Sequence, residues 1–255
     1  MKRKRELTLR QEIRIRSIKI TAMLLAVLAG IYVYNYPTEY YPASDNARNL
    51  FKEAKEEGYL YSSPEDNKNL ILKANEDTDT GILFYPGGKV EYIAYLPLLN
   101  SLREAGYDVV LIKMPYNLAF FDMNAAAEVI TDMKYDLPNV KNWYIMGHSL
   151  GGVAASSYAA KFPEDVRGLI LLGAYDYGGY EPTDTLVIYG SNDLNLNLSK
   201  IDFEKSRVYC IDGGNHAWFG DYGKQEGDGE ATISHSDQQT QTVSYCIDWI
   251  NGDNN

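Results

Sequence analysis

Short apolar segments alternate with helical segments along most of this chain, and this alternation most restricts its fold. Strands are predicted for the apolar runs at 59–62, 69–73, 81–85, 108–112, 143–146, 167–174, 185–189 and 207–211. Helices are predicted near 47–58, 92–105, 122–135, 150–162 and 238–250. Strands that alternate with helices favour a mostly parallel central sheet with helices on both faces. The sequence therefore predicts a single α/β domain.

The first 40 residues differ from the rest of the chain in charge and hydropathy. Residues 1–19 contain eight basic and two acidic residues, and the run from Ile20 to Tyr34 contains no charged residue. This run is shorter than the roughly 20 apolar residues that span a bilayer, but Lys19 can extend it by snorkelling. We expect residues 1–40 to be a basic cytoplasmic segment and membrane anchor, with the domain at 41–255 outside the membrane.

Two other interpretations of this segment stay open. Val27-Leu28-Ala29 forms a weak cleavage pattern, so the segment could be a signal peptide. It could also be a buried core helix, although the basic residues suit a membrane surface better.

The two cysteines leave two alternatives. Export of the domain would permit a disulfide between Cys210 and Cys246, but two buried free thiols are an equally good expectation.

The charge outside this segment limits the partners. The remaining 236 residues hold 16 basic and 33 acidic residues, a net charge of −17. A body this acidic repels phosphate backbones, so we expect no nucleic-acid partner.

Gly147-His148-Ser149-Leu150-Gly151 fits the pattern G-x-S-x-G and is the strongest chemical signal in the sequence. The pentapeptide follows an apolar strand and opens a helix rich in small residues, which is the setting of a nucleophile elbow. Its strained turn exposes the serine hydroxyl, and the helix N-terminus behind it favours a developing negative charge. Ser149 is therefore the candidate nucleophile.

A serine nucleophile needs a base, and the chain has three histidines. His148 adjoins Ser149 and is interpreted as structural, while His235 lies in a polar stretch and is expected to be solvated. His216 follows the last predicted strand through Gly213-Gly214-Asn215, a loop that can hold an imidazole at the same sheet edge as Ser149. We expect His216 to be the base.

An acidic residue should orient the imidazole of that base. Asp193 follows the strand at 185–189 and lies one strand upstream of His216. Asp176, after the preceding strand, is the alternative.

The oxyanion formed in such a reaction needs two N–H donors. The backbone N–H of Leu150 is one candidate. The loop Pro86-Gly87-Gly88-Lys89 supplies the other from Gly88 or Lys89, because Pro86 has no N–H.

These motifs together resemble the α/β-hydrolase superfamily, from about Gly81 to Ile250. The resemblance is to the small lidless bacterial branch similar to dienelactone hydrolase-like proteins. It is carried by Phe84-Tyr85-Pro86-Gly87-Gly88-Lys89-Val90, Gly147-His148-Ser149-Leu150-Gly151-Gly152, Gly190-Ser191-Asn192-Asp193 and Gly213-Gly214-Asn215-His216. The order of Ser149, Asp193 and His216 is that of the fold.

The resemblance implies a serine hydrolase that cleaves a small-molecule ester or related acyl bond through an acyl-enzyme, without a cofactor. Dienelactone hydrolases proper use a cysteine at the position of Ser149, so lactone chemistry is not implied. A cell-surface acyltransferase or peptidase with the same triad, and a non-catalytic binding domain, stay open as alternatives.

The connections between strands indicate the kind of substrate. Only residues 175–184 are available for a cap, too few for a helical lid, so we expect an open site that suits small or chain-end substrates. The apolar loop 114–123 either walls the acyl pocket or belongs to the core.

Four acidic residues lie close together near the C-terminus, but they do not match a calcium loop. They are interpreted as a solvated acidic loop, and no metal site is expected: Asp221, Glu226, Asp228 and Glu230.

Overall fold

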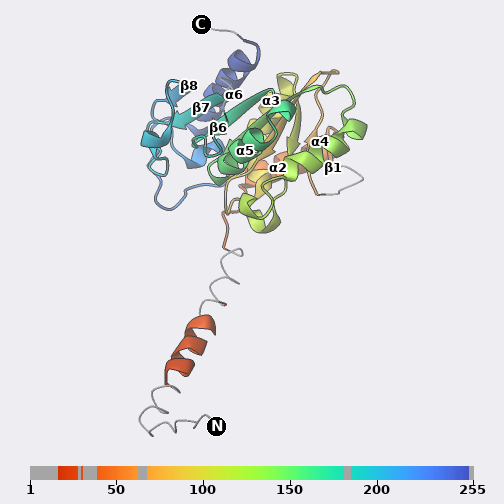
Figure 1. The fold of residues 1–255 in the computed structure, drawn as a ribbon. Helices are drawn as coiled ribbons and strands as arrows, with labels where there is room; N and C mark the ends of the chain where they lie inside the picture. The colour runs from red at the N-terminus through yellow and green to blue at the C-terminus, as the bar shows by residue number, and fades with distance from the viewer. Residues whose placement is uncertain (1–16, 28–29, 31–38, 63–67, 181–184, 253–255) are drawn as a thin grey trace. The chain divides into compact units, whose positions relative to one another are not determined.

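The computed structural model describes residues 17–27, 30, 39–62, 68–180 and 185–252 (Figure 1). The chain divides into two units, Met1–Glu39 and Tyr40–Asn255. In the first unit, residues 17–27 and residue 30 are helical. No helix within the described ranges is both long and apolar enough to cross a membrane. Much of the expected basic segment and anchor lies outside the described residues.

The second unit is built on one sheet of eight strands. In sheet order these are β1 (Leu60–Ser62), β2 (Leu70–Leu72), β4 (Asp108–Leu111), β3 (Thr80–Tyr85), β5 (Asn142–His148), β6 (Gly168–Leu172), β7 (Thr185–Gly190) and β8 (Arg207–Ile211). β1 pairs antiparallel with β2, and β2 with β4, whereas every pair from β4 to β8 is parallel. The carboxyl ends of the parallel strands therefore share one edge of the sheet.

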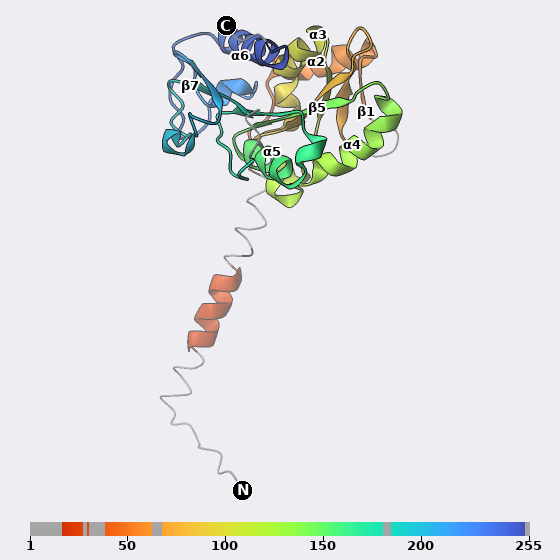
Figure 2. The same cartoon turned by 45° about the horizontal axis from the view of Figure 1, so that its top comes forward.

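Helices cover both faces of this sheet. One face carries α2 (Asp45–Glu56), α3 (Leu96–Glu104) and α6 (His235–Ile250), and the other carries α4 (Ala125–Asp136) and α5 (Leu150–Lys161) (Figure 2). The strands are apolar throughout because both faces are buried. On β3, Ile82 and Phe84 pack against the first group of helices, whereas Leu83 and Tyr85 pack against the second.

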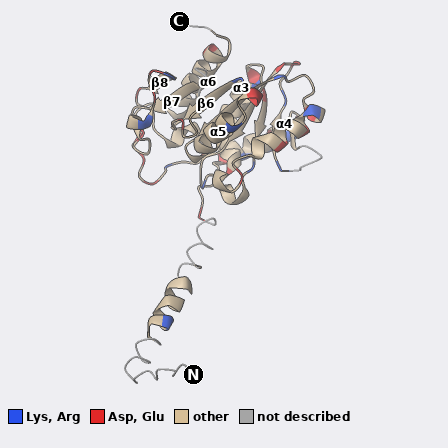
Figure 3. Ribbon diagram, in the orientation of Figure 1, with Lys and Arg blue, Asp and Glu red and all other residues tan. Residues whose placement is uncertain are grey.

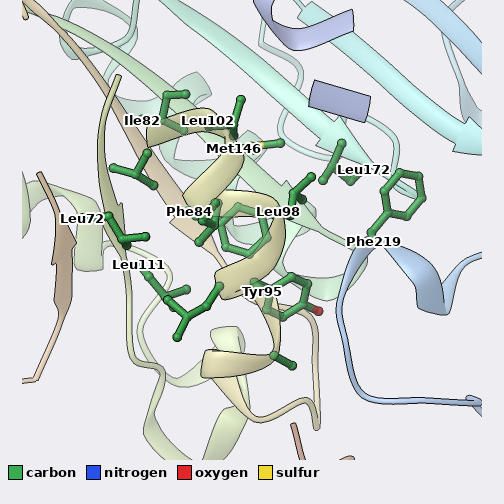
Figure 4. Close-up of a cluster of buried hydrophobic side chains, with 14 of the residues drawn as sticks. Leu72, Ile82, Phe84, Tyr95, Leu98, Leu102, Leu111, Met146, Leu172 and Phe219 are labelled. Carbon is green, nitrogen blue, oxygen red and sulfur yellow. The ribbon is translucent and has the colours of Figure 1, made fainter. Parts of the chain in front are cut away.

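Charged residues lie mainly outside the centre of the sheet. β3, β5, β6 and β7 contain no Lys, Arg, Asp or Glu, and the central strands are tan in Figure 3. The core on the side of α3 contains Phe84, Leu98, Met146 and Leu172, and the Tyr95 ring lies in the same cluster (Figure 4).

The expected mostly parallel α/β fold is confirmed, with small shifts at helix starts. The helix expected from residue 92 begins as a 3₁₀ turn, Tyr92–Tyr95, and α3 starts only at Leu96, with Pro97 in its first turn. α6 starts three residues earlier than expected, because the Ser234 hydroxyl accepts the Asp237 N–H and caps the helix. Residues 173–180, the described part of the β6–β7 connection, contain no helix, in line with the absence of a cap domain.

The two cysteines do not form a disulfide. Cys210, on β8, is exposed, and Cys246, on α6, is buried in the core. Both thiols are free, but of the two buried thiols expected only Cys246 is buried, where it acts as a small core residue.

Candidate active site

Ser149 occupies the sharp turn between β5 and α5. Its backbone has φ 52° and ψ −120°, a conformation that costs a non-glycine residue on the order of 1–3 kcal/mol. Its N–H donates to the carbonyl of Leu172, at the end of the neighbouring strand β6. The hydroxyl makes no hydrogen bond within the described residues, and the residue is half-buried. The turn therefore presents the hydroxyl at the carboxyl edge of the sheet.

The glycines of the pentapeptide are required by close backbone approaches. A Cβ atom on Gly147 would lie 2.4 Å from the carbonyl oxygen of Gly151. A Cβ atom on Gly151 would lie 2.2 Å from the carbonyl oxygen of Tyr85. Any side chain at either position would push α5 away from the sheet and with it the turn that carries Ser149.

His216 and Asp193 form a buried pair. Nδ1 of His216 lies 2.8 Å from Oδ2 of Asp193, so Nδ1–H donates to the carboxylate. The other carboxylate oxygen accepts the N–H groups of Asn195 and Leu196, each at 2.9 Å. Nε2 of His216 is buried and has no hydrogen-bond partner among the described residues. In the neutral ring this nitrogen is the acceptor, so it is available to a hydroxyl.

The turn with Ser149 and the His216–Asp193 pair meet at Gly173. A Cβ atom on Gly173 would lie 2.9 Å from Nδ1 of His216 and 3.0 Å from Oδ2 of Asp193. Leu172, which accepts the Ser149 N–H, directly precedes Gly173. The rings of His216 and His148, the neighbour of Ser149, have centroids 4.6 Å apart. The structure thus brings the three residues to one region, and no hydrogen bond joins Ser149 to His216 among the described residues.

In the loop after β3, the N–H groups of Gly87 and Lys89 both donate to other residues. The N–H of Gly87 donates to the Tyr95 hydroxyl at 3.0 Å, and the N–H of Lys89 donates to the carbonyl of Asn117 at 2.8 Å. Gly88 lies between them, and a Cβ atom on it would be 2.8 Å from Cδ2 of Leu150. Of the two donors left open by the sequence, Lys89 is therefore occupied elsewhere, and Gly88 lies beside Leu150, whose N–H is the first of α5.

His148 is buried between this loop and His216. Its Nε2 lies 3.0 Å from the carbonyl oxygen of His216, which only accepts, so Nε2 carries the proton. Nδ1 then accepts the hydroxyl proton of Tyr95 at 2.7 Å. Burial, together with the neighbouring His216 ring, lowers the pKa of His148 well below its ordinary value of 6.5. His148 is therefore a neutral structural residue, as expected. A single chain of hydrogen bonds runs from Gly87 through Tyr95 and His148 to His216.

A family model of the alpha/beta hydrolase family matches residues 81–240. This chain belongs to the alpha/beta hydrolase family. A serine hydrolase-like protein from Danio rerio is 35% identical over 74 residues, which cover 28% of this chain and only 23% of that protein's length. Among solved structures, dienelactone hydrolase from Anabaena variabilis has a TM-score of 0.51 at 19% identity, over 76% of this chain and 95% of that one. Est1E from Butyrivibrio proteoclasticus has a TM-score of 0.52 at 13% identity, over 76% and 100%. At these identities the structures show the fold.

Two residues of this alpha/beta hydrolase that hold His216 were not identified from the sequence. The carboxylate of Asp228 accepts the N–H groups of His216 at 3.2 Å and of Ala217 at 2.8 Å. The buried Gln238 side chain accepts the Asn215 N–H at 2.9 Å and donates to the Asn215 carbonyl at 2.8 Å. The interpretation of Asp228 as part of a solvated loop was wrong. No periodic pattern marks Asp228 in the sequence, and an aspartate before a glycine indicates only a turn.

The remaining candidates have hydrogen-bond partners other than His216 and Asp193. Asp176, whose pKa is raised by burial, accepts the N–H of Gly178. His235 is half-buried rather than solvated, with its Nε2 3.2 Å from the carbonyl oxygen of Gly220. Among the residues that the structure describes, no group of acidic, histidine or cysteine side chains could hold a metal ion.

Proposed function

We propose that this alpha/beta hydrolase is a serine hydrolase that cleaves a carboxylic ester or a related acyl bond through an acyl-enzyme. The observation that carries the proposal is the buried His216–Asp193 pair. Nε2 of His216 has no hydrogen-bond partner among the described residues, and His216 lies in the same region as Ser149 with its strained backbone. An imidazole held by a carboxylate on one nitrogen and open on the other is the arrangement of a general base.

The proposed reaction has two halves. Oγ of Ser149 attacks the acyl carbon while its proton moves to Nε2 of His216. The resulting oxyanion accepts hydrogen bonds from the N–H groups of Gly88 and Leu150. When the bond to the leaving oxygen breaks, His216 returns the proton to that oxygen. Water then attacks the acyl-enzyme by the same route, giving the acid and free Ser149.

Covalent labelling tests the nucleophile directly. A fluorophosphonate probe is expected to label the wild-type chain and not Ser149→Ala, and p-nitrophenyl acetate turnover should vanish in the same variant. A wild-type chain that turns over the ester while Ser149→Ala still takes the label would reject Ser149. Failure of the wild-type chain to react with both reagents would reject the hydrolase.

We also propose that residues 1–40 anchor residues 41–255 outside the cytoplasmic membrane. The support is the basic cluster in residues 1–19 followed by the uncharged run from Ile20 to Tyr34. Alkaline carbonate extraction of cells that express the full chain should leave it in the membrane pellet, whereas a chain that begins at Tyr40 should stay in the supernatant. Release of the intact full chain by carbonate would contradict the anchor, and a shortened mature chain would indicate signal cleavage.

A further inference from the structure

Exposed aromatic side chains gather in the segment Pro115–Phe121, which follows β4. Tyr116 is 67% exposed, Phe120 72% and Phe121 55%. The apolar loop expected here therefore divides into two parts, because Met114, Leu118 and Ala119 are buried in the core. Three neighbouring exposed aromatics form an apolar surface that water solvates poorly, and such surfaces commonly mark a binding site.

This aromatic segment is held in place rather than loosely attached. Tyr116 and Asn117 both have positive φ, 54° and 55°, a rare conformation for two successive non-glycine residues. The ring of Phe121 packs edge-to-face against Tyr116 at 5.6 Å and against Phe120 at 6.0 Å between centroids. A strained turn over buried neighbours thus presents a preformed aromatic surface.

The aromatic segment lies next to the proposed oxyanion donors. The carbonyl of Asn117 accepts the Lys89 N–H, and Lys89 follows Gly88, which packs against Leu150. The 3₁₀ turn Ala119–Phe121 also contacts α5, the helix that begins at Leu150. Four non-glycine residues have positive φ within the described residues. Two of them, Tyr116 and Asn117, are in the aromatic segment; Lys89 is in the loop after β3, and Ser149 forms its own turn.

The proposed reaction indicates which part of a substrate meets this surface. The leaving oxygen must reach Nε2 of His216 to receive its proton, so the leaving group lies on the side of His216. The acyl chain extends from the same carbon in another direction, and the aromatic segment is joined to the loop of Gly88 rather than to that of His216. The apolar surface is therefore placed for the acyl part.

We propose that the aromatic segment binds the acyl chain of the substrate, and that this enzyme acts on esters of apolar acids several carbons long. This inference rests on the proposed serine hydrolase activity and specifies its substrate class. It goes beyond the small substrates that a site without a helical cap suggests. An open aromatic surface lets a longer chain lie across the domain without a lid. Each methylene that becomes buried should raise kcat/KM about fourfold.

The test is an acyl-length series with p-nitrophenyl acetate, butyrate and octanoate. The wild-type kcat/KM should rise along the series. In the double variant Phe120→Ala, Phe121→Ala, the value for octanoate should fall about 10-fold or more, mainly through KM, while the value for acetate stays within about twofold. Tyr135→Ala removes an equally exposed aromatic, 77% exposed, from the last turn of α4 and should change neither value.

Two outcomes would overturn the inference. These are a wild-type enzyme without preference for octanoate, and a double variant whose ratio of octanoate to acetate is unchanged, whether or not both values fall. Fluorophosphonate labelling in parallel separates these from failure of the hydrolase itself, because a hydrolase with a different substrate class still takes the label.

Discussion

The hydroxyl oxygen of Tyr95 lies 2.7 Å from Nδ1 of His148, and this buried contact joins three separate loops of the site. Through Tyr95 it holds the N–H of Gly87, in the loop that carries Gly88. Through His148 it reaches the residue before Ser149 and the carbonyl of His216. The loop after β3, the turn of Ser149 and the loop of His216 are thus fixed relative to one another by one hydrogen-bonded chain.

We expect Tyr95→Phe to reduce both stability and kcat. The variant keeps the ring but leaves the Gly87 N–H and Nδ1 of His148 unpaired, at a cost of about 1–3 kcal/mol in the free energy of unfolding. Because the loops then lose their common connection, kcat should fall about 10-fold with little change in KM. Urea denaturation and p-nitrophenyl ester kinetics measure the two effects.

Tyr158→Phe is the matched control for this variant. Tyr158 is a fully buried tyrosine on α5 whose hydroxyl lies 3.0 Å from Oδ2 of Asp165, outside the site. It should lose stability and keep kcat. If both variants lowered kcat equally, Tyr95 would be an ordinary core residue.

The strands and the positions of Ser149, Asp193 and His216 could be predicted from the sequence, because local sequence patterns determine them. The apolar runs fix the strands, and the elbow pentapeptide after such a run fixes the position of Ser149. Asp193 and His216 follow strand ends within a few residues, so the parallel sheet brings them to the same edge.

The parts that were not predictable depend on contacts between distant segments. The choice between Gly88 and Lys89 is decided by the carbonyl of Asn117, 28 residues after Lys89. The role of Asp228 depends on a loop that returns to His216. The exposure of Phe120, beside the buried Ala119, reflects packing against α5 that the loop's composition does not show.

The buried, neutral state of His148 predicts how stability depends on pH. Because burial lowers its pKa below 6.5, the unfolded chain binds a proton that the folded chain does not once the pH falls below about 6.5. The free energy of unfolding should then decrease by up to about 1.4 kcal/mol per pH unit from this group. Urea denaturation between about pH 7.5 and about pH 5 should show a shallower decrease in His148→Asn than in the wild type. Parallel curves would contradict this origin of the acid sensitivity.

Asp193 should be the acid that orients His216, in preference to Asp176. Asp193→Asn keeps the size of the side chain but favours the wrong tautomer of His216, so kcat should fall by about 10³–10⁴. Asp176→Asn changes a carboxylate that accepts the Gly178 N–H in its own loop and should keep kcat within about threefold. The comparison is made by ester kinetics and by the rate of fluorophosphonate labelling. A large loss in Asp176→Asn with a small one in Asp193→Asn would reverse the assignment.

Asp228 should act as a positioning residue for His216. Asp228→Asn replaces one acceptor oxygen with an amide NH2 group, which only donates, so the N–H of either His216 or Ala217 loses its partner. We expect kcat to fall about 10-fold while KM changes little, since the imidazole shifts but the aromatic segment proposed to bind the acyl chain does not. Glu226→Gln, an exposed acid in the same loop, is the control and should match the wild type. Equal effects of the two substitutions would point to loop charge rather than to the Asp228 hydrogen bonds.

Gly88 should supply the second N–H to the oxyanion, and its lack of a side chain makes this testable. In Gly88→Ala the new Cβ would lie 2.8 Å from Cδ2 of Leu150, which forces the loop away from α5 or displaces that side chain. A displaced donor is expected to lower kcat by about 10²-fold with little change in KM, because the hydrogen bond forms only as the oxyanion develops. The double variant Gly88→Ala, Leu150→Ala removes Cδ2 and should recover part of the lost kcat, since the loop can return toward α5. A lowered kcat in Gly88→Ala that the double variant does not recover at all would show that the contact with Leu150 does not position the donor.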